Sequence, residues 1–175
     1  MEEKLSGVRK VKEKSTSIVT DLTDLRILDQ LQKDASQSNQ DLAALVGVSP
    51  ATCLRRVRRL VDAEVIERRV ALLSPARMGV GLTGIVEVTL DHQGAERLAA
   101  FERRADTELA VQQCYRVSAG PDFVIIATVI DMGAWAALVE RLFTQDANVR
   151  NVKTFFVVAR AKYDLRVPLP WPAGG

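Results

Sequence analysis

The sequence is poor in the side chains that most often carry catalysis, metal binding or covalent cross-links. Its 175 residues include 1 histidine and 2 cysteines, and the positions of Cys53 and Cys114 do not match the close spacing of metal ligands. Two cysteines are also too few for a disulfide framework in a chain of this length, so both thiols are expected to be reduced. The sequence contains no nucleophile–base pair, no metal-binding cluster and no phosphate-binding loop. We therefore expect no enzyme: no catalytic residue, no metal and no cofactor.

Long apolar runs are missing as well. The longest, Phe123–Ile130, is far shorter than the roughly 18 residues that a membrane-spanning helix needs. The opening stretch MEEKLSGVRKVKEK is charged throughout and lacks the apolar segment of a signal peptide. The composition, with 47% hydrophobic and 26% charged residues, is ordinary for a globular protein. We expect a cytoplasmic protein of one ordinary domain or two small ones, with no membrane partner.

The net charge of +2 is small but unevenly distributed along the chain. The first 77 residues carry 14 Lys and Arg against 11 Asp and Glu, whereas the remaining residues carry 10 against 11. The basic excess peaks in SPATCLRRVRRL (49–60), where four arginines fall within five positions. A charge run alone usually marks a solvated helix face, so its meaning depends on the elements around it.

The residues before this run predict two helices and a tight turn. A stripe of apolar residues in 21–34 predicts the first helix; it consists of Leu22, Leu25, Leu28 and Leu31, with Ile27 beside them. SNQD at 38–41 fits a capping box, with Asp in place of Glu or Gln, and predicts a second, short helix. Gly47 ends that helix, and Ser49-Pro50 is typical of the start of a third.

On the third helix, aliphatic and basic residues separate. At about 100° per residue, the side that faces the first two helices holds Cys53, Leu54, Val57, Leu60 and Val61. The opposite side holds Ala51, Thr52, Arg55 and Arg59, flanked by Arg56 and Arg58. A helix, a glycine turn and a second helix with a basic outer face form the helix-turn-helix arrangement, so we expect double-stranded DNA as a partner.

The predicted DNA contacts begin in the first turn of the third helix, where small residues allow close approach to base edges, and continue along its arginines. They are Ser49, Ala51, Thr52, Arg55, Arg56, Arg59 and Arg68. Arg68 and Arg69 lie in VIERRVALLS (65–74), which we interpret as a strand pair or wing. An exposed turn is the alternative there.

The second half of the chain has another pattern. Alternating β-branched strands and amphipathic helices predict the order β-α-β-β-α-β over 82–90, 95–107, 109–118, 122–131, 134–146 and 149–163. This is the ferredoxin-like order, in which both helices cover one face of an antiparallel sheet. Since the other face would expose apolar residues, we expect it to pack on a second subunit.

The fold class is therefore α+β, with a winged helix-turn-helix domain before a ferredoxin-like domain. The predicted segments are a flexible arm (1–20), the DNA-binding domain (21–74), a hinge (75–81), the ferredoxin-like oligomerisation domain (82–165), to which the resemblance below assigns effector binding, and a proline-rich tail (166–175).

Four stretches resemble a known family when taken together and in this order. They are LAALVGVSPATCLRRVRRL, VALLSP, QCYRVSAGPDFVI and IDMGAWAALVERLF, and they resemble the Lrp/AsnC, or feast/famine, family of transcription regulators over about Asp21–Leu169. The resemblance implies a ferredoxin-like effector domain (the RAM domain), dimers that form through its sheet, and assembly to octamers. It also implies small amino acids as effectors in clefts between dimers, and control of amino-acid metabolism or transport genes.

The resemblance also implies an effector site. The family's effector turn corresponds to Ala119, Gly120, Pro121 and Asp122, with Asp122 meeting the ammonium group of the ligand. Family members usually read Gly-x-x-Asp there, so Ala119 replaces a glycine. Further positions match residues near the cleft: Met132 and Trp135, with Phe155 and Phe156. Plain core packing is the alternative for these four.

Several other positions carry smaller expectations. Where the family tends to have Gly after the recognition helix and Gly-Tyr in the wing, this chain has Glu64 and Arg68-Arg69. Cys53 is expected to be a core residue, and His92 a surface loop residue. Asp21 and Asp24 are expected to serve the N-terminus of the first helix.

The leading functional hypothesis is a sequence-specific DNA-binding regulator that responds to an amino acid. A siroheme-decarboxylase-like enzyme has a similar fold, but such enzymes depend on histidines, and this chain has His92 alone. An architectural DNA-wrapping protein is a third hypothesis. Salt dependence and the ratio of specific to non-specific affinity would separate it from a specific regulator.

Overall fold

The computed structural model describes residues 20–172, which form two compact units. One unit contains residues 20–72 together with 162–172, and the other contains residues 73–161. Apart from Thr20, the predicted arm lies outside the described residues. The predicted α+β fold is confirmed, whereas the segment boundaries given above stay a prediction.

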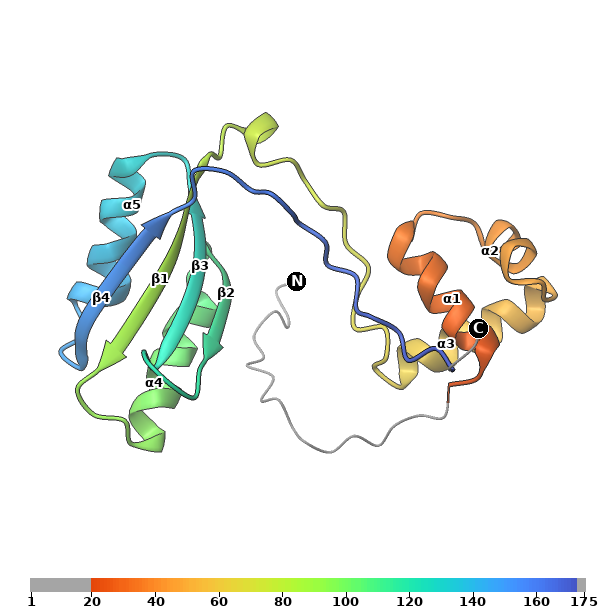
Figure 1. Ribbon diagram of the computed structural model, residues 1–175, viewed down its shortest axis with the longest axis horizontal. Coiled ribbons are helices and arrows are strands. Elements are labelled where there is room, and N and C mark those ends of the chain that lie inside the picture. The colour runs from red at the N-terminus through yellow and green to blue at the C-terminus, as the bar shows by residue number, and fades with distance from the viewer. Residues whose placement is uncertain (1–19, 173–175) are drawn as a thin grey trace, which may run out of the picture. The chain divides into compact units, whose positions relative to one another are not determined.

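The first unit consists of three helices and the C-terminal segment (Figure 1). The helices are α1 (Leu22–Lys33), α2 (Asn39–Val46) and α3 (Pro50–Asp62). Ser38 and Ser49 cap α2 and α3, and Gly47 takes a φ of 73° in the turn between them, as predicted. The side chains that form its core are Ile27, Leu28, Leu42, Ala43, Val46, Cys53, Val57 and Leu60.

Three aliphatic residues that were predicted to face this core are exposed instead. Leu22, Leu54 and Val61 are 49%, 40% and 45% exposed. On α1 the buried side includes the charged Asp24, which lies beside Leu25. On α3, Leu54 and Val61 lie about 80–100° around the helix from Cys53, beyond the surface that α1 and α2 cover.

The strand pair predicted over 65–74 is absent, and the alternative, an exposed segment, is what the structure has there. After α3 ends, residues 67–74 contain neither helix nor strand, and all of them are exposed. A strand needs a neighbour for its backbone hydrogen bonds, and the described part of this unit contains no strand that could pair with it.

The proline-rich C-terminal segment is fastened to α1, which the sequence did not predict. The Val167 backbone N–H donates to Gln32 Oε1 at 2.6 Å, and Gln32 Nε2 donates back to the Val167 carbonyl at 3.2 Å. Leu169 packs against the helical core. The first unit is therefore completed by residues 162–172, which follow the whole second unit in the sequence.

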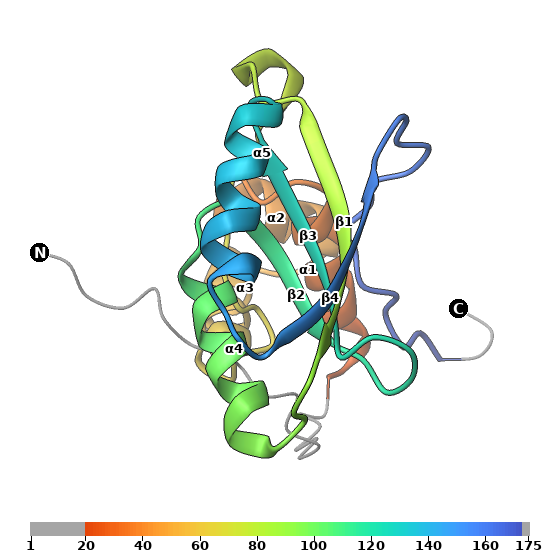
Figure 2. The same ribbon diagram turned by 90° about the vertical axis from the view of Figure 1, so that its left-hand side faces the viewer.

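The second unit is a four-stranded antiparallel sheet in the order β2-β3-β1-β4, with two helices on one face (Figure 2). After a 3₁₀ turn (Ala76–Met78), its elements are β1 (Leu82–Leu90), α4 (Ala95–Thr107), β2 (Val111–Arg116), β3 (Phe123–Val129), α5 (Met132–Val139), which continues as a π-helical turn (Glu140–Thr144), and β4 (Val149–Phe156). The predicted ferredoxin-like order is confirmed. The last strand stops at Phe156, short of the predicted residue 163, because its partner strand β1 begins only at Leu82.

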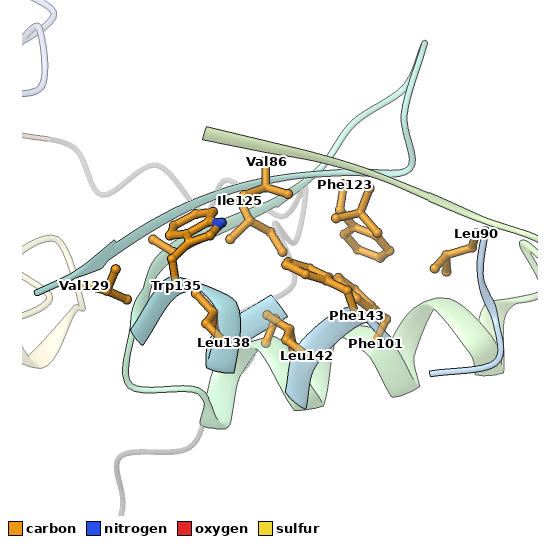
Figure 3. Close-up of a cluster of buried hydrophobic side chains, with 13 residues drawn as sticks. Val86, Leu90, Phe101, Phe123, Ile125, Val129, Trp135, Leu138, Leu142 and Phe143 are labelled. Atoms are coloured by element: carbon orange, nitrogen blue, oxygen red, sulfur yellow. The ribbon is translucent and has the colours of Figure 1, made fainter. Parts of the chain in front are cut away.

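The core of this unit lies between the sheet and the helices (Figure 3). Phe101 from α4 stacks near Phe123 and Phe143, with ring centroids 4.7 and 6.4 Å apart. At the other end of the core, Trp135 of α5 meets the edge of Phe156 with centroids 5.1 Å apart. A Cβ added to Gly84 would lie 2.1 Å from Cη2 of Trp135, so glycine is what lets the indole pack closely against β1.

We expect Gly84→Ala to destabilise the protein by about 1–3 kcal/mol, because the added methyl group overpacks a closed core. Gly81→Ala is the matched control, since a Cβ at Gly81 would meet nothing within 4 Å. Thermal or urea unfolding of both variants checks this. Equal stability of Gly84→Ala and wild type would contradict the packing described for Trp135.

Candidate nucleic-acid interface and effector turn

The first turn of α3 is rigid and open to solvent. The Thr52 backbone N–H donates to Ser49 Oγ at 3.2 Å, and the Ser49 hydroxyl donates to Thr52 Oγ1 at 2.9 Å. Asn39 Nδ2 donates to the Pro50 carbonyl at 2.9 Å, which ties the start of α2 to the start of α3. Ser49 and Ala51 are exposed. The turn therefore presents small side chains on a helix N-terminus whose geometry is fixed.

The four arginines of α3 divide into two pairs. Arg55 and Arg58 are exposed and make no ion pair with any other described residue. They lie along a shallow, open depression on the outer surface of α3, lined by Ala51, Leu54, Arg55, Arg58, Arg59, Asp62 and Ala63. This pair is the uncompensated positive charge of the helix.

Arg56 and Arg59 bind carboxylates of α1. Arg56 Nη1 lies 2.7 Å from Asp21 Oδ2 and 3.0 Å from Asp24 Oδ1. Arg59 Nη2 donates to Asp24 Oδ2. The Asp24 side chain is 0% exposed, whereas the Arg56 and Arg59 side chains are 21% and 45% exposed. Two of the four arginines are thus held at the contact between α1 and α3.

The two aspartates also form the N-terminal cap of α1. The Asp24 backbone N–H donates to Asp21 Oδ1 at 2.9 Å, and the Asp21 N–H donates to Asp24 Oδ2 at 3.2 Å, which completes a capping box. The backbone N–H of Asp24 and the Arg56 guanidinium lower the pKa of Asp21. The predicted helix-terminus role of both aspartates is confirmed, but the burial of Asp24 and its arginine partners were missed. The signal was available: Arg56 lies on the side of α3 that faces α1.

At α2 the predicted capping box is only half formed. The Asp41 N–H donates to Ser38 Oγ at 3.2 Å, but the Asp41 carboxylate accepts from the Ser38 hydroxyl at 2.7 Å rather than from its backbone.

The end of α3 holds a non-glycine residue in the left-handed region. Glu64 has a φ of 56°. Its N–H donates to the Val61 carbonyl at 2.9 Å, and the Val65 N–H donates to the Leu60 carbonyl at 3.0 Å. This pair of bonds is a Schellman motif, which glycine occupies with less strain. Beyond it, Arg68 and Arg69 lie exposed on the segment without strands, and the role of Arg68 in DNA binding stays a prediction.

The effector turn connects β2 to β3. Ala119 and Gly120 are exposed, and Gly120 takes a φ of 85°. The left-handed residue of this turn is thus a glycine, one position after Ala119. Asp122 is fixed by three hydrogen bonds: its Oδ2 accepts from the Leu90 N–H at 2.7 Å, its own N–H donates to the Val88 carbonyl at 2.9 Å, and its carbonyl accepts from the Val117 N–H at 3.1 Å.

The other predicted effector residues do not join this turn within one chain. Asp122 directly precedes β3, whereas Met132 and Trp135 follow the far end of that strand. Met132 is exposed, but Trp135 is only 4% exposed and belongs to the core, where its ring contacts Phe156, which is itself 40% exposed. Phe155 lies exposed on the opposite face of the sheet, paired with Ile85. The arrangement favours core packing for Trp135.

The remaining expectations concern Cys53 and His92. Cys53 is fully buried in the helical core, as predicted, and burial raises the pKa of its thiol. His92 is an exposed loop residue, also as predicted; its N–H donates to Asn148 Oδ1 at 3.0 Å, and Asn148 Nδ2 donates to the His92 carbonyl at 3.1 Å. Within residues 20–172, no helix has the length and apolar character needed to cross a membrane.

Family comparisons match both units. Residues 20–67 match a winged helix-turn-helix DNA-binding family, and residues 83–167 match the Lrp/AsnC ligand binding domain. An HTH-type transcriptional regulator of Haemophilus influenzae is 36% identical over 82% of this chain and 86% of that protein. The leucine-responsive regulatory protein of Escherichia coli is 33% identical over 84% of this chain and 90% of that protein.

Solved structures agree. An AsnC family transcriptional regulator from Agrobacterium tumefaciens has a TM-score of 0.80 at 31% identity, covering 85% of this chain and 97% of that one. A transcriptional regulator from Neisseria meningitidis in complex with L-Met has a TM-score of 0.81 at 28% identity, covering 86% and 97%.

Proposed function

The chain belongs to the Lrp/AsnC family of DNA-binding transcriptional regulators, and on that premise we propose that it binds a specific operator and changes its DNA binding or its assembly when a small amino acid binds. The observation that supports this most is the outer face of α3, where Arg55 and Arg58 make no ion pair with another described residue, beside an open first turn. The family implies genes of amino-acid metabolism or transport as targets, and a cytoplasmic, nucleoid-associated protein.

We propose that Ser49, Ala51 and Thr52 meet the major groove, because a recognition helix usually enters it with its N-terminal residues. Arg55, one turn further along, would reach base edges or phosphates, and Arg58 and Arg68 would meet phosphates. The sequence also predicted Arg56 and Arg59 as contacts. We leave them out of this set because Asp24 holds their guanidinium groups.

For the effector, we propose that the turn formed by Ala119, Gly120 and Asp122 binds the amino acid. Oδ2 of Asp122 is occupied by the Leu90 N–H, and no other described residue bonds to its Oδ1, which leaves one oxygen for an ammonium group. A site that also includes Met132 needs a second subunit, since β3 separates the two within one chain. The L-Met complex of the Neisseria relative supports an amino-acid ligand of this kind.

The exposed sheet face supports the proposed homodimer. Apolar and aromatic side chains from all four strands lie on the face without helices: Ile85, Tyr115, Val124, Ile126 and Phe155. Ile85, Tyr115 and Phe155 are 37%, 52% and 43% exposed, which is unusual for a continuous sheet surface in water. We propose that a second copy of the chain covers this face, and the family implies further assembly to an octamer.

We also propose that the role is regulatory and not catalytic. The matched relatives named above are transcriptional regulators. The single histidine, which a siroheme-decarboxylase-like activity would need, is hydrogen-bonded to Asn148 in a loop. An architectural protein is separated from a specific regulator by the first experiment below.

Arg55→Gln should weaken operator binding by about 1–3 kcal/mol and relax specificity at one base position if Arg55 reads a base. Arg58→Gln should weaken binding to all DNA sequences equally. It should also lower the salt slope, which is the slope of log affinity against log salt concentration, by about one unit, as expected for a phosphate contact. Anisotropy titrations on an operator selected in vitro and on a scrambled duplex, across a salt series, measure both effects. Arg26→Gln removes an exposed arginine of α1 and is the control. Equal affinity of the wild type for both duplexes would favour the architectural alternative.

Asp122→Asn should lose amino-acid binding yet keep the fold, because the amide oxygen still accepts from the Leu90 N–H while the charge is gone. The lost charge-assisted bond is worth on the order of 1.5–3 kcal/mol. A thermal-shift screen of amino acids on the wild type identifies the ligand, and calorimetry compares the variants. Asp122→Ala, which also removes the bond to β1, should lower the melting temperature in addition. Unchanged ligand affinity in Asp122→Asn would refute the assignment of Asp122 as the partner of the ligand's ammonium group.

Sedimentation at micromolar concentration should give a dimer or a larger even-numbered assembly and no 19.3 kDa particle. Ile85→Asp should shift the population towards monomer, since it places a charge in the centre of the proposed interface while Ile85 is not part of the core. A wild type that sediments as a stable monomer would refute the interface.

A further inference from the structure

We propose that Asp24 selects which arginines of the recognition helix act on DNA: it withholds Arg56 and Arg59 and leaves Arg55 and Arg58 as the contacting pair. The inference rests on the proposed DNA-binding function. It makes Asp24, a residue of α1 buried beneath α3, a positioning residue for specificity.

Both oxygens of the Asp24 carboxylate are occupied. Oδ1 accepts from Arg56 Nη1 at 3.0 Å, and Oδ2 accepts from Arg59 Nη2 and from the Asp21 N–H at 3.2 Å. Arg56 Nη1 also donates to Asp21 Oδ2 at 2.7 Å. Two carboxylates and two guanidinium groups thus form one closed cluster with no net charge.

Burial makes this cluster hard to open. A carboxylate that is fully removed from water is stable only while it is paired and hydrogen-bonded. If either arginine turned towards a phosphate, Asp24 would lose a partner inside the unit, and the phosphate contact at the surface would not replace it. Arg56 and Arg59 therefore stay with Asp24 when α3 approaches the duplex.

The consequence is a division of charge along α3. The sequence shows four arginines within five positions, but the field that DNA meets comes from two of them. Arg55 and Arg58 are three positions apart, so they lie on one side of the helix, the side that also presents Ala51; Arg59 lines the same surface, but its Nη2 donates to Asp24. Because counterion release counts the phosphates that a protein neutralises, this pair sets the contribution of α3 to the salt slope.

The division also favours specificity. Positive charges that are free to move bind any phosphate, and they raise affinity for all sequences alike. Holding Arg56 and Arg59 on Asp24 limits that non-specific binding and keeps Arg55 in a defined position relative to the first turn of α3. A variant that frees the two arginines should bind random DNA better and distinguish the operator less.

The central test compares Arg55→Gln with Arg59→Gln, which remove the same charge one helical turn apart. Each full-length variant is titrated on a random-sequence duplex by anisotropy across a salt series. On random DNA, where no base is recognised and Arg55 meets phosphate as Arg58 does, we expect Arg55→Gln and Arg58→Gln to lower the salt slope by about one unit each. Arg56→Gln and Arg59→Gln should leave the slope within error of the wild type, although they lower the melting temperature.

Asp24→Asn tests the opposite change, because it removes the carboxylate and keeps the arginines. It should steepen the slope by about one unit, since Arg59 loses its carboxylate partner while Arg56 keeps Asp21, and narrow the ratio of operator to random affinity. Adding Arg59→Gln to Asp24→Asn should return the slope to about that of the wild type. Circular dichroism checks that these variants fold, and the four arginine variants keep the test decisive if Asp24→Asn does not.

The outcomes are distinguishable. The proposal that Asp24 withholds Arg59 from DNA is overturned if Arg59→Gln lowers the salt slope as much as Arg55→Gln does. A folded Asp24→Asn variant with an unchanged salt slope overturns it as well. If none of the four arginine variants changes DNA binding, the proposed DNA surface itself fails, and this inference fails with it.

Discussion

The DNA-binding unit depends on a single buried carboxylate. Asp24 is excluded from water, so the unit is stable only in the arrangement that brings two arginines of α3 and the cap of α1 to its oxygens. Sliding or rotating α3 along α1 would break several charge-assisted bonds at once. Apolar packing between Ile27, Val57 and Leu60 tolerates small shifts, whereas this cluster does not. The direction in which α3 presents its outer face follows from that constraint.

The effector unit also has one contact that fixes its packing, and that contact depends on steric fit instead of charge. Gly84 lets the Trp135 indole approach β1 more closely than any side chain would allow, and Phe156 closes the same contact from β4. α5 is thereby seated against the two strands whose outward face carries Ile85 and Phe155. At the other end of β1, Asp122 holds Leu90, so the effector turn is tied to this strand as well. Both ends of β1 thus carry contacts that matter to the proposed assembly and ligand site.

Much of this could be predicted from the sequence, and the failures have physical reasons. Helix starts at Ser38 and Ser49 and the turn at Gly47 were predictable because caps are local chemistry. The order of the strands followed from hydrophobic periodicity. Periodicity within α1 did not predict the burial of Asp24, since it assigns charged residues to the outside; the signal lay on α3, where Arg56 falls on the side that faces α1. Likewise, Arg56 and Arg59 belong to the basic run in sequence, but their partners lie more than 30 positions earlier.

The C-terminal segment shows a further limit of local patterns, and it bears on how the two units are joined. Prolines and small residues predicted only a tail, yet Val167 is bonded to Gln32 of α1. Within residues 20–172, the chain therefore passes between the units twice. One crossing runs from the end of α3 to the start of β1, and the other runs from the end of β4 to the segment bound on α1. β1 and β4 are paired neighbours, with Gly84 opposite Phe156, and α1 and α3 are the helices that Asp24 joins. The connections within residues 20–172 thus link two neighbouring strands of the effector unit to α1 and α3, the helices whose contact sets the arginine face.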